Sequence, residues 1–179
     1  MSWIYQARIA AYLRRAGGAG TNEGRGRNYE NLLAYLISSI PGCEVTRNAL
    51  NHYGTEEADL AVSNMRLQQG LPLLPENFLV ECKNWSKPVD STTLGYFVNV
   101  MVDRGCSLGV LAAANGITGH RQHRDRAYAI GAAALIRHIR ILVITTDDLR
   151  TLTEPGDLAT LLHRRNSQLT ANGTIYFGP

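Results

Sequence analysis

At residues 78–85 the sequence reads Phe78-Leu79-Val80-Glu81-Cys82-Lys83-Asn84-Trp85, the pattern of a short β-strand that carries two opposite charges. Side chains alternate between the two faces of a strand, so the apolar Phe78, Val80 and Cys82 share one face. Glu81 and Lys83 share the other face. Burial of either charge without a partner costs several kcal/mol. A salt bridge, water in a cleft or a metal ion must therefore compensate these charges.

A second strand pattern lies upstream and also carries a charge among apolar neighbours. Ala58-Asp59-Leu60-Ala61-Val62 places Asp59 in an otherwise apolar segment. If the two strands pair, Asp59, Glu81 and Lys83 converge. Two carboxylates and a lysine at one place are typical of a divalent-metal site with a polar group that manages the attacking water. The alternative is a solvated strand face with a weak ion pair, which contributes about 0–1 kcal/mol.

The composition is that of one globular domain with small appendages. The chain has 179 residues, of which 45% are hydrophobic, and a net charge of +3. Its pI of about 8.9 permits a nucleic-acid partner without requiring one. Three scattered cysteines and no Cys-x-x-Cys pair favour free thiols in a reducing cytosol. No apolar run approaches the ~20 residues of a membrane helix, and the N-terminus does not resemble a signal peptide. We therefore expect a cytoplasmic protein without a membrane partner.

The order of predicted elements indicates an α/β fold with a mixed central sheet flanked by helices. A continuous apolar strand at 108–114 follows a helix that begins at residue 91, which predicts a parallel strand–helix–strand unit. The residues between the first two helices are rich in glycine and predict a mobile loop. The helices are predicted at 2–15, 28–40, 91–104 and 118–136 with a further helical region after 146, and the strands at 43–47, 58–64, 78–85, 108–114 and 139–144.

Three further residues near these strands are candidates for function. Glu30 lies in the first turn of the predicted helix 28–40, where it either favours the helix dipole or approaches a metal cleft. Trp85 follows the charged strand, and either packs on the core or stacks on a sugar or base; core packing is the preferred interpretation. Lys87 is a candidate for a phosphate contact.

The densest basic segment of the chain is Thr118–Arg126, at the start of a predicted helix. Arg121, Arg124 and Arg126 lie within two turns of each other. The alternatives are a solvated helix start and a contact with the phosphate backbone of a nucleic acid.

With this order of elements, residues 28–146 resemble the PD-(D/E)XK nuclease superfamily, and most closely its Mrr-like restriction endonuclease domains. Glu30 matches the helical Glu of that family, Asp59 the motif Asp, and Glu81 with Lys83 the (D/E)-x-K pair. Ala58 stands where the motif has proline. The resemblance implies that Asp59, Glu81 and the backbone carbonyl of Cys82 hold Mg²⁺, with Mn²⁺ as an alternative, and that Glu30, Asp59, Glu81 and Lys83 form the catalytic set.

The resemblance also implies an activity, namely metal-dependent endonucleolytic hydrolysis of DNA in restriction or antiviral defence. Two alternatives stay open: a catalytically silent nucleic-acid-binding module, and a partner-dependent nuclease subunit of a larger defence complex. No helix-turn-helix, zinc-finger or ATPase motif is recognisable, so specificity must come from loops, a homodimer or a partner protein. We expect a nuclease domain at 28–150, preceded by a helix and loop at 1–27 and followed by a helical appendage at 151–179.

Overall fold

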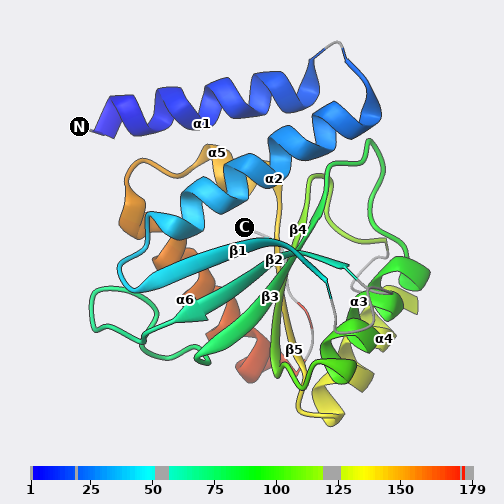
Figure 1. Ribbon diagram of the computed structural model, residues 1–179. Coiled ribbons are helices and arrows are strands. Elements are labelled where there is room, and N and C mark those ends of the chain that lie inside the picture. The colour runs from blue at the N-terminus through cyan, green and yellow to red at the C-terminus, as the bar shows by residue number, and fades with distance from the viewer. Residues whose placement is uncertain (1, 19, 51–56, 119–125, 174, 176–179) are drawn as a thin grey trace.

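The computed structural model describes residues 2–18, 20–50, 57–118, 126–173 and 175, and it contains one five-stranded sheet with helices on both faces (Figure 1). The predicted α/β fold with a mixed central sheet is thereby confirmed. The strands are β1 (Cys43–Leu50), β2 (Glu57–Asn64), β3 (Asn77–Lys83), β4 (Leu108–Ala113) and β5 (Arg140–Ile144). The helices are α1 (Ser2–Gly17), α2 (Asn22–Ser38), α3 (Ser91–Asp103), α4 (Arg126–Ile136), α5 (Thr146–Arg150) and α6 (Pro155–Asn172).

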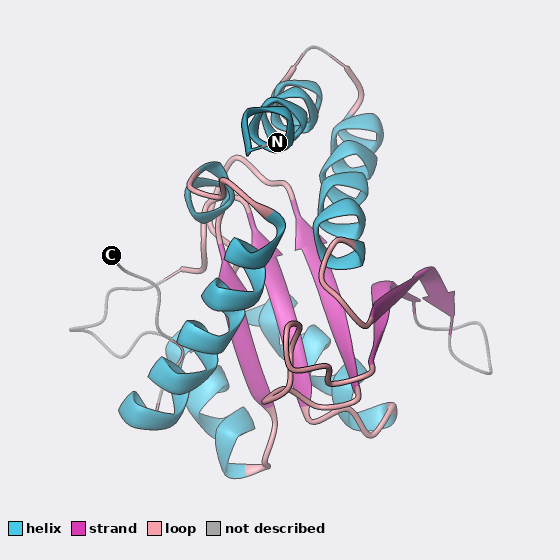
Figure 2. Ribbon diagram, turned by 90° about the vertical axis from the view of Figure 1, so that its left-hand side faces the viewer, coloured by secondary structure: helices cyan, strands magenta, loops and turns pink. Residues whose placement is uncertain are grey.

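The five strands follow one another across the sheet in chain order. β1, β2 and β3 pair antiparallel, whereas β3, β4 and β5 pair parallel through the crossover helices α3 and α4. Helices lie in front of and behind the strands (Figure 2). All six residues of β4 are buried, as the continuous apolar run predicts. Gly109 on β4 lets α3 approach, because an added Cβ would lie 2.5 Å from Met101 Sδ and 2.8 Å from the Phe97 ring.

The connection between β2 and β3 is organised by one buried side chain, Asn64, which is 2% exposed. Its Nδ2 donates to the carbonyls of Leu71 (2.9 Å), Leu74 (3.3 Å) and Pro75 (3.0 Å), and its Oδ1 accepts from the Arg66 amide at 3.0 Å. These bonds satisfy polar groups that burial would otherwise leave unpaired. Asn64 therefore ties the loop to the end of β2.

The second helix begins earlier than the sequence predicts. α2 starts at Asn22, with Thr21 as its N-cap, whose Oγ1 accepts from the Gly24 amide at 3.1 Å. Asn28 lies inside the helix and donates from Nδ2 to the Gly24 carbonyl at 2.8 Å. The predicted loop is therefore wrong for residues 22–27. Glycines cost a helix about 1 kcal/mol each, but the cap and the contact with α1 outweigh that cost.

The C-terminal helices pack back on the sheet. Thr145 and Asp148 form a capping box at the start of α5, and Arg165 of α6 forms a buried 2.8 Å ion pair with Asp148. Pro155 occupies the first turn of α6 and so begins this helix. Beyond α6, the described residues are Gly173 and the buried Ile175. Among the described helices, none combines the length and apolarity required to cross a membrane.

Candidate active site

Strand register brings Asp59 and Glu81 to the same face of the sheet. The β2–β3 pairing runs from Ser63 opposite Asn77 to Leu60 opposite Val80, so the next step along both strands aligns Asp59 with Glu81. Directly opposite residues of an antiparallel pair project to the same side. Both side chains therefore lie on one face, at the end of the pairing.

The Asp59 carboxylate replaces a backbone acceptor at this point. Its Oδ2 accepts a hydrogen bond from the Cys82 amide at 2.7 Å. The N–H and C=O of one strand residue point to the same side, so the Cys82 carbonyl also faces β2. The neighbouring Lys83 carbonyl points the other way and accepts from the Ala114 amide at 2.9 Å. Asp59 and the Cys82 carbonyl are thus on the same side of β3.

Lys83 forms an ion pair with Glu81, two residues earlier on the same face. Neither side chain is fully exposed: 22% of the Lys83 side chain and 12% of the Glu81 side chain reach solvent. The Lys83 ammonium also lies 5.9 Å from the centre of the Trp85 ring. The pair therefore provides one cation beside two carboxylates.

Burial and neighbouring charges shift the pKa of Asp59, Glu81 and Lys83. Burial raises the pKa of Asp59, against the lowering effects of the Cys82 amide and Lys83. Burial, and then the charge of Asp59, raise the pKa of Glu81. Burial lowers the pKa of Lys83, but Glu81 and its hydrogen bond outweigh this and leave the pKa raised. Lys83 therefore stays protonated near neutral pH, and among the described residues it is the cation that lowers the pKa of both carboxyl groups.

The oxygen atoms available at this site suit Mg²⁺ better than they suit a metal ion that binds through side chains alone. Within the described part of the chain, no group of three or more His, Cys, Asp or Glu side chains is arranged to hold a metal. Mg²⁺ commonly takes one or two carboxylates and keeps several waters, and it prefers oxygen ligands. Asp59, Glu81 and the Cys82 carbonyl supply such a set.

Glu30 lies on α2 close to this pair without completing a three-carboxylate cluster. Its Oε2 is 3.9 Å from the Arg47 guanidinium on β1. Burial, and then Asp59, raise the pKa of Glu30, while Arg47 lowers it. The charge of Glu30 is therefore felt at the site. No local pattern could have identified Arg47, because strand pairing brings it to α2.

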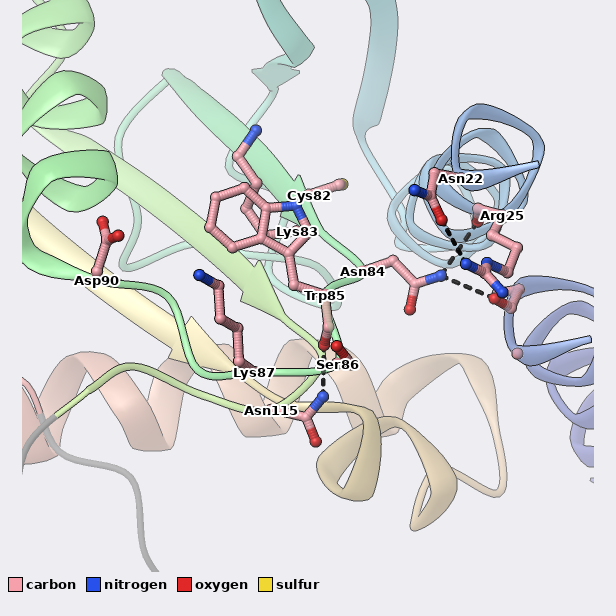
Figure 3. Close-up of a pocket in the computed structure, with 13 residues that line it drawn as sticks. Asn22, Arg25, Cys82, Lys83, Asn84, Trp85, Ser86, Lys87, Asp90 and Asn115 are labelled. Carbon is pink, nitrogen blue, oxygen red and sulfur yellow. Dashed lines mark hydrogen bonds between the residues drawn. The ribbon is translucent and has the colours of Figure 1, made fainter.

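A cleft of about 710 Å³ adjoins Lys83 (Figure 3). Lys87, a candidate for a phosphate contact, lines it, and so does Trp85. Trp85 is 38% exposed, so the preference for core packing is wrong. Sequence reasoning did not find Arg25, Asn84 and Asn115, which also line the cleft.

The predicted basic patch is only partly within the described residues. Arg121 and Arg124 lie outside them. Arg126 is the first residue of α4, but its side chain is not among those described. Their contact with phosphates stays a prediction.

Comparison with protein families identifies the family of this chain. A protein-family model described as "Restriction endonuclease" matches residues 22–152, which is well over half of the chain. A search of the curated proteins found no match. The matched segment begins at the first residue of α2 and includes all five strands.

Proposed function

The chain belongs to the Mrr-like restriction endonuclease domains of the PD-(D/E)XK superfamily, and on this premise we propose that it is a divalent-metal-dependent endonuclease that hydrolyses DNA. Membership of the family supports a nuclease, which is a hydrolase. The metal requirement and the DNA substrate are our proposals beyond this family assignment.

One observation carries the proposal. Asp59 and Glu81 share a partly buried face on which Lys83 is the single cation among the described residues, and the carboxyl pKa of both acids is raised. A fold does not retain uncompensated charge at a strand end for stability, since burial without a partner is costly. A divalent cation from solvent would compensate it.

Mg²⁺ is the ion we propose, with Mn²⁺ as the alternative, held by Asp59, Glu81 and the Cys82 carbonyl. When bound, such an ion polarises a phosphate oxygen and lowers the pKa of a coordinated water. Asp59 keeps its place through the Cys82 amide, which fixes the orientation of its carboxylate.

Lys83 supplies a positive charge and hydrogen-bond donors beside the carboxylates. Its raised pKa keeps the ammonium protonated near neutral pH, and Glu81 holds it in position. It can donate to the attacking water or to a phosphate oxygen as negative charge develops there. Glu30 and Arg47 bound the site from α2 and β1 and adjust its charge.

A plasmid-nicking time course with and without Mg²⁺ tests the proposal on wild type, Lys83→Ala and Asp59→Asn. We expect a loss of about a hundredfold for Lys83→Ala, because one electrostatic contact to the transition state is removed. Asp59→Asn should lose at least as much. Arg137→Ala, which removes an exposed cation just after α4, is the control and should cut like wild type.

Mg²⁺ binding is measured separately by thermal melting, because a bound ligand stabilises the folded state. If Mg²⁺ raises the Tm of wild type but not that of Asp59→Asn, the result supports the metal site independently of activity. Cleavage that neither variant impairs would place the nuclease site elsewhere. DNA binding without cleavage of any nucleic acid would instead support the catalytically silent binding module.

We also propose that the DNA cleaved is foreign to the cell, as in restriction or antiviral defence in the cytoplasm. The match to a restriction endonuclease family supports this assignment. Specificity would come from a homodimer or from a partner protein. Plating efficiency of phage on a bacterial host that expresses wild type or Asp59→Asn tests it: equal plaque counts would contradict a defence role.

A further inference from the structure

Two adjoining cavities form one groove at the carboxyl-terminal ends of β3 and β4. The first is the cleft of about 710 Å³, and the second has about 280 Å³. Four residues line both cavities: Ala16, Gly17, Asn84 and Asn115. We call these two adjoining cavities the strand-end groove. In open α/β sheets ligands bind outside the carboxyl ends of the strands, so its position is that of a binding site.

The walls of the strand-end groove are fixed by hydrogen bonds. Asn84 follows β3 and donates from Nδ2 to the Ala16 carbonyl (2.9 Å) and the Arg25 carbonyl (3.2 Å), which ties α1 and α2 to the catalytic strand. Asn115 donates from Nδ2 to the Trp85 carbonyl. Figure 3 shows these bonds on either side of the cleft. The groove is therefore largely preformed, which lowers the ordering cost of binding.

The segment that carries Trp85 and Lys87 is also held at its far end. Val89 donates to the Gly116 carbonyl at 2.8 Å and accepts from the Thr118 amide at 2.8 Å. These bonds join the segment after β3 to the loop after β4. Trp85 is therefore an exposed ring on a restrained backbone.

The lining is basic and contains one aromatic ring. Arg25, Lys83 and Lys87 line the first cavity. Asp90 is the single acid among the described residues that line this first cavity, and its Oδ1 accepts a hydrogen bond from the Thr93 amide at 2.9 Å as the N-cap of α3. A positively charged groove with an aromatic platform suits single-stranded nucleic acid, because phosphates follow the cations and every base has a face that can stack.

The volume of the groove suits a small part of one strand. Clefts of about 300–1,000 Å³ enclose one small molecule. One or a few nucleotides of a single strand therefore fit within it.

We propose that the strand-end groove binds a single nucleic-acid strand, with a base stacked on Trp85 and phosphates near Arg25 and Lys87. Lys83 lines the groove and pairs with Glu81, so a strand bound here leads directly to the carboxylates. The role of this strand as a substrate rests on the proposed function, whereas the binding itself does not. The protein would then cut at single-stranded or locally unpaired nucleotides.

Binding is tested without metal, in EDTA, so that no cleavage occurs. The chain has two tryptophans, and Trp3→Phe leaves Trp85 as the reporter. Titration with a ten-nucleotide oligo(dT) should quench Trp85 fluorescence, and added salt should reverse the quenching. The mononucleotide dTMP should bind far more weakly, which separates a strand from a free nucleotide.

Variants are compared by anisotropy of a labelled oligonucleotide. Trp85→Ala and Arg25→Ala should each weaken single-strand binding about tenfold, and Trp85→Phe should restore most of it. Tyr96→Ala, an exposed aromatic on α3, and Arg27→Ala, an exposed cation on α2, are the matched controls and should bind like wild type. Thermal melts verify that each variant is folded.

Three results would overturn the inference. The first is no quenching of Trp85 fluorescence, and the second is that dTMP binds as tightly as the oligonucleotide. The third is that Trp85→Ala and Arg25→Ala lose as much affinity for duplex DNA as for single-stranded DNA. If wild type binds the oligonucleotide but does not cut, the proposed hydrolysis fails and the groove stands. If wild type cuts duplex plasmid and Trp85 does not respond, the groove fails and the nuclease stands.

Discussion

Replacement of Asp59 by Asn is expected to stabilise the fold while it abolishes metal-dependent cleavage. The amide keeps the shape of the side chain and an oxygen that accepts the Cys82 N–H. It removes one of two carboxylates that share a partly buried face with a single lysine. Stability and activity therefore change in opposite directions, as is common for functional residues.

The magnitude follows from Coulomb's law. Two unit charges about 5 Å apart, the separation expected for carboxylates that share a cation, repel by about 3 kcal/mol at an effective dielectric constant of about 20. The attraction between Asp59 and Lys83, which the substitution removes, offsets part of this repulsion. A neutral acceptor also makes a weaker bond to the Cys82 amide, by about 1 kcal/mol. The net gain is about 1 kcal/mol, or a rise in Tm of about 2–4 °C for a chain of this size.

The gain in stability of Asp59→Asn over wild type changes with pH in one direction. Burial raises the pKa of the Asp59 carboxyl above its unfolded value of about 4. The stability that a raised carboxyl pKa contributes is fully present below the unfolded pKa, and it is lost as pH rises through the folded pKa. Wild type therefore loses stability relative to Asp59→Asn between about pH 4 and neutrality, and the two proteins converge in acid.

Urea unfolding in EDTA at a series of pH values measures the difference. Glu44→Gln removes an exposed carboxylate from β1 and serves as the control, with an expected change within about 0.5 kcal/mol. Mg²⁺ should then stabilise wild type more than Asp59→Asn. If Asp59→Asn is less stable than wild type at neutral pH in EDTA, its charge is already compensated, and the reasoning from two opposed carboxylates is refuted.

Three further predictions address other parts of the chain. Replacing Arg121, Arg124 and Arg126 by Ala should reduce the slope of log K for DNA binding against log salt concentration by about 0.9 for each phosphate that the protein no longer binds. An unchanged slope in a binding titration would indicate a solvated helix start. Asn64→Ala should cost at least about 2 kcal/mol in urea unfolding, because buried loop carbonyls lose their donor; a cost under about 0.5 kcal/mol would contradict this. Gly109→Ala should cost about 1–3 kcal/mol by overpacking against α3, measured in the same assay, and wild-type stability would show that α3 can move away.

The central β-strands and the faces of their charged side chains followed from the sequence. The alternation at residues 78–85 and 58–62 assigned faces correctly, because side-chain direction along a strand depends only on local backbone geometry. The continuous apolar run at 108–114 predicted a buried parallel strand in the same way. The α/β fold and the family were confirmed. The roles of Glu30, Asp59, Glu81 and Lys83 stay predictions for the assays above.

Tertiary structure decided what local pattern could not. The start of α2 at Asn22 depends on a cap at Thr21 and on contact with α1, which outweigh the low helix propensity of glycine. The exposure of Trp85 depends on the strand-end groove beside it, since nothing within its own segment distinguishes a core ring from a surface ring. Arg25 lines the groove because α2 packs against β3, where Asn84, far along the chain, donates to the Arg25 carbonyl. Contacts between distant segments are set by packing of the whole chain, and so the sequence supplied the carboxylates while the fold supplied the groove that faces them.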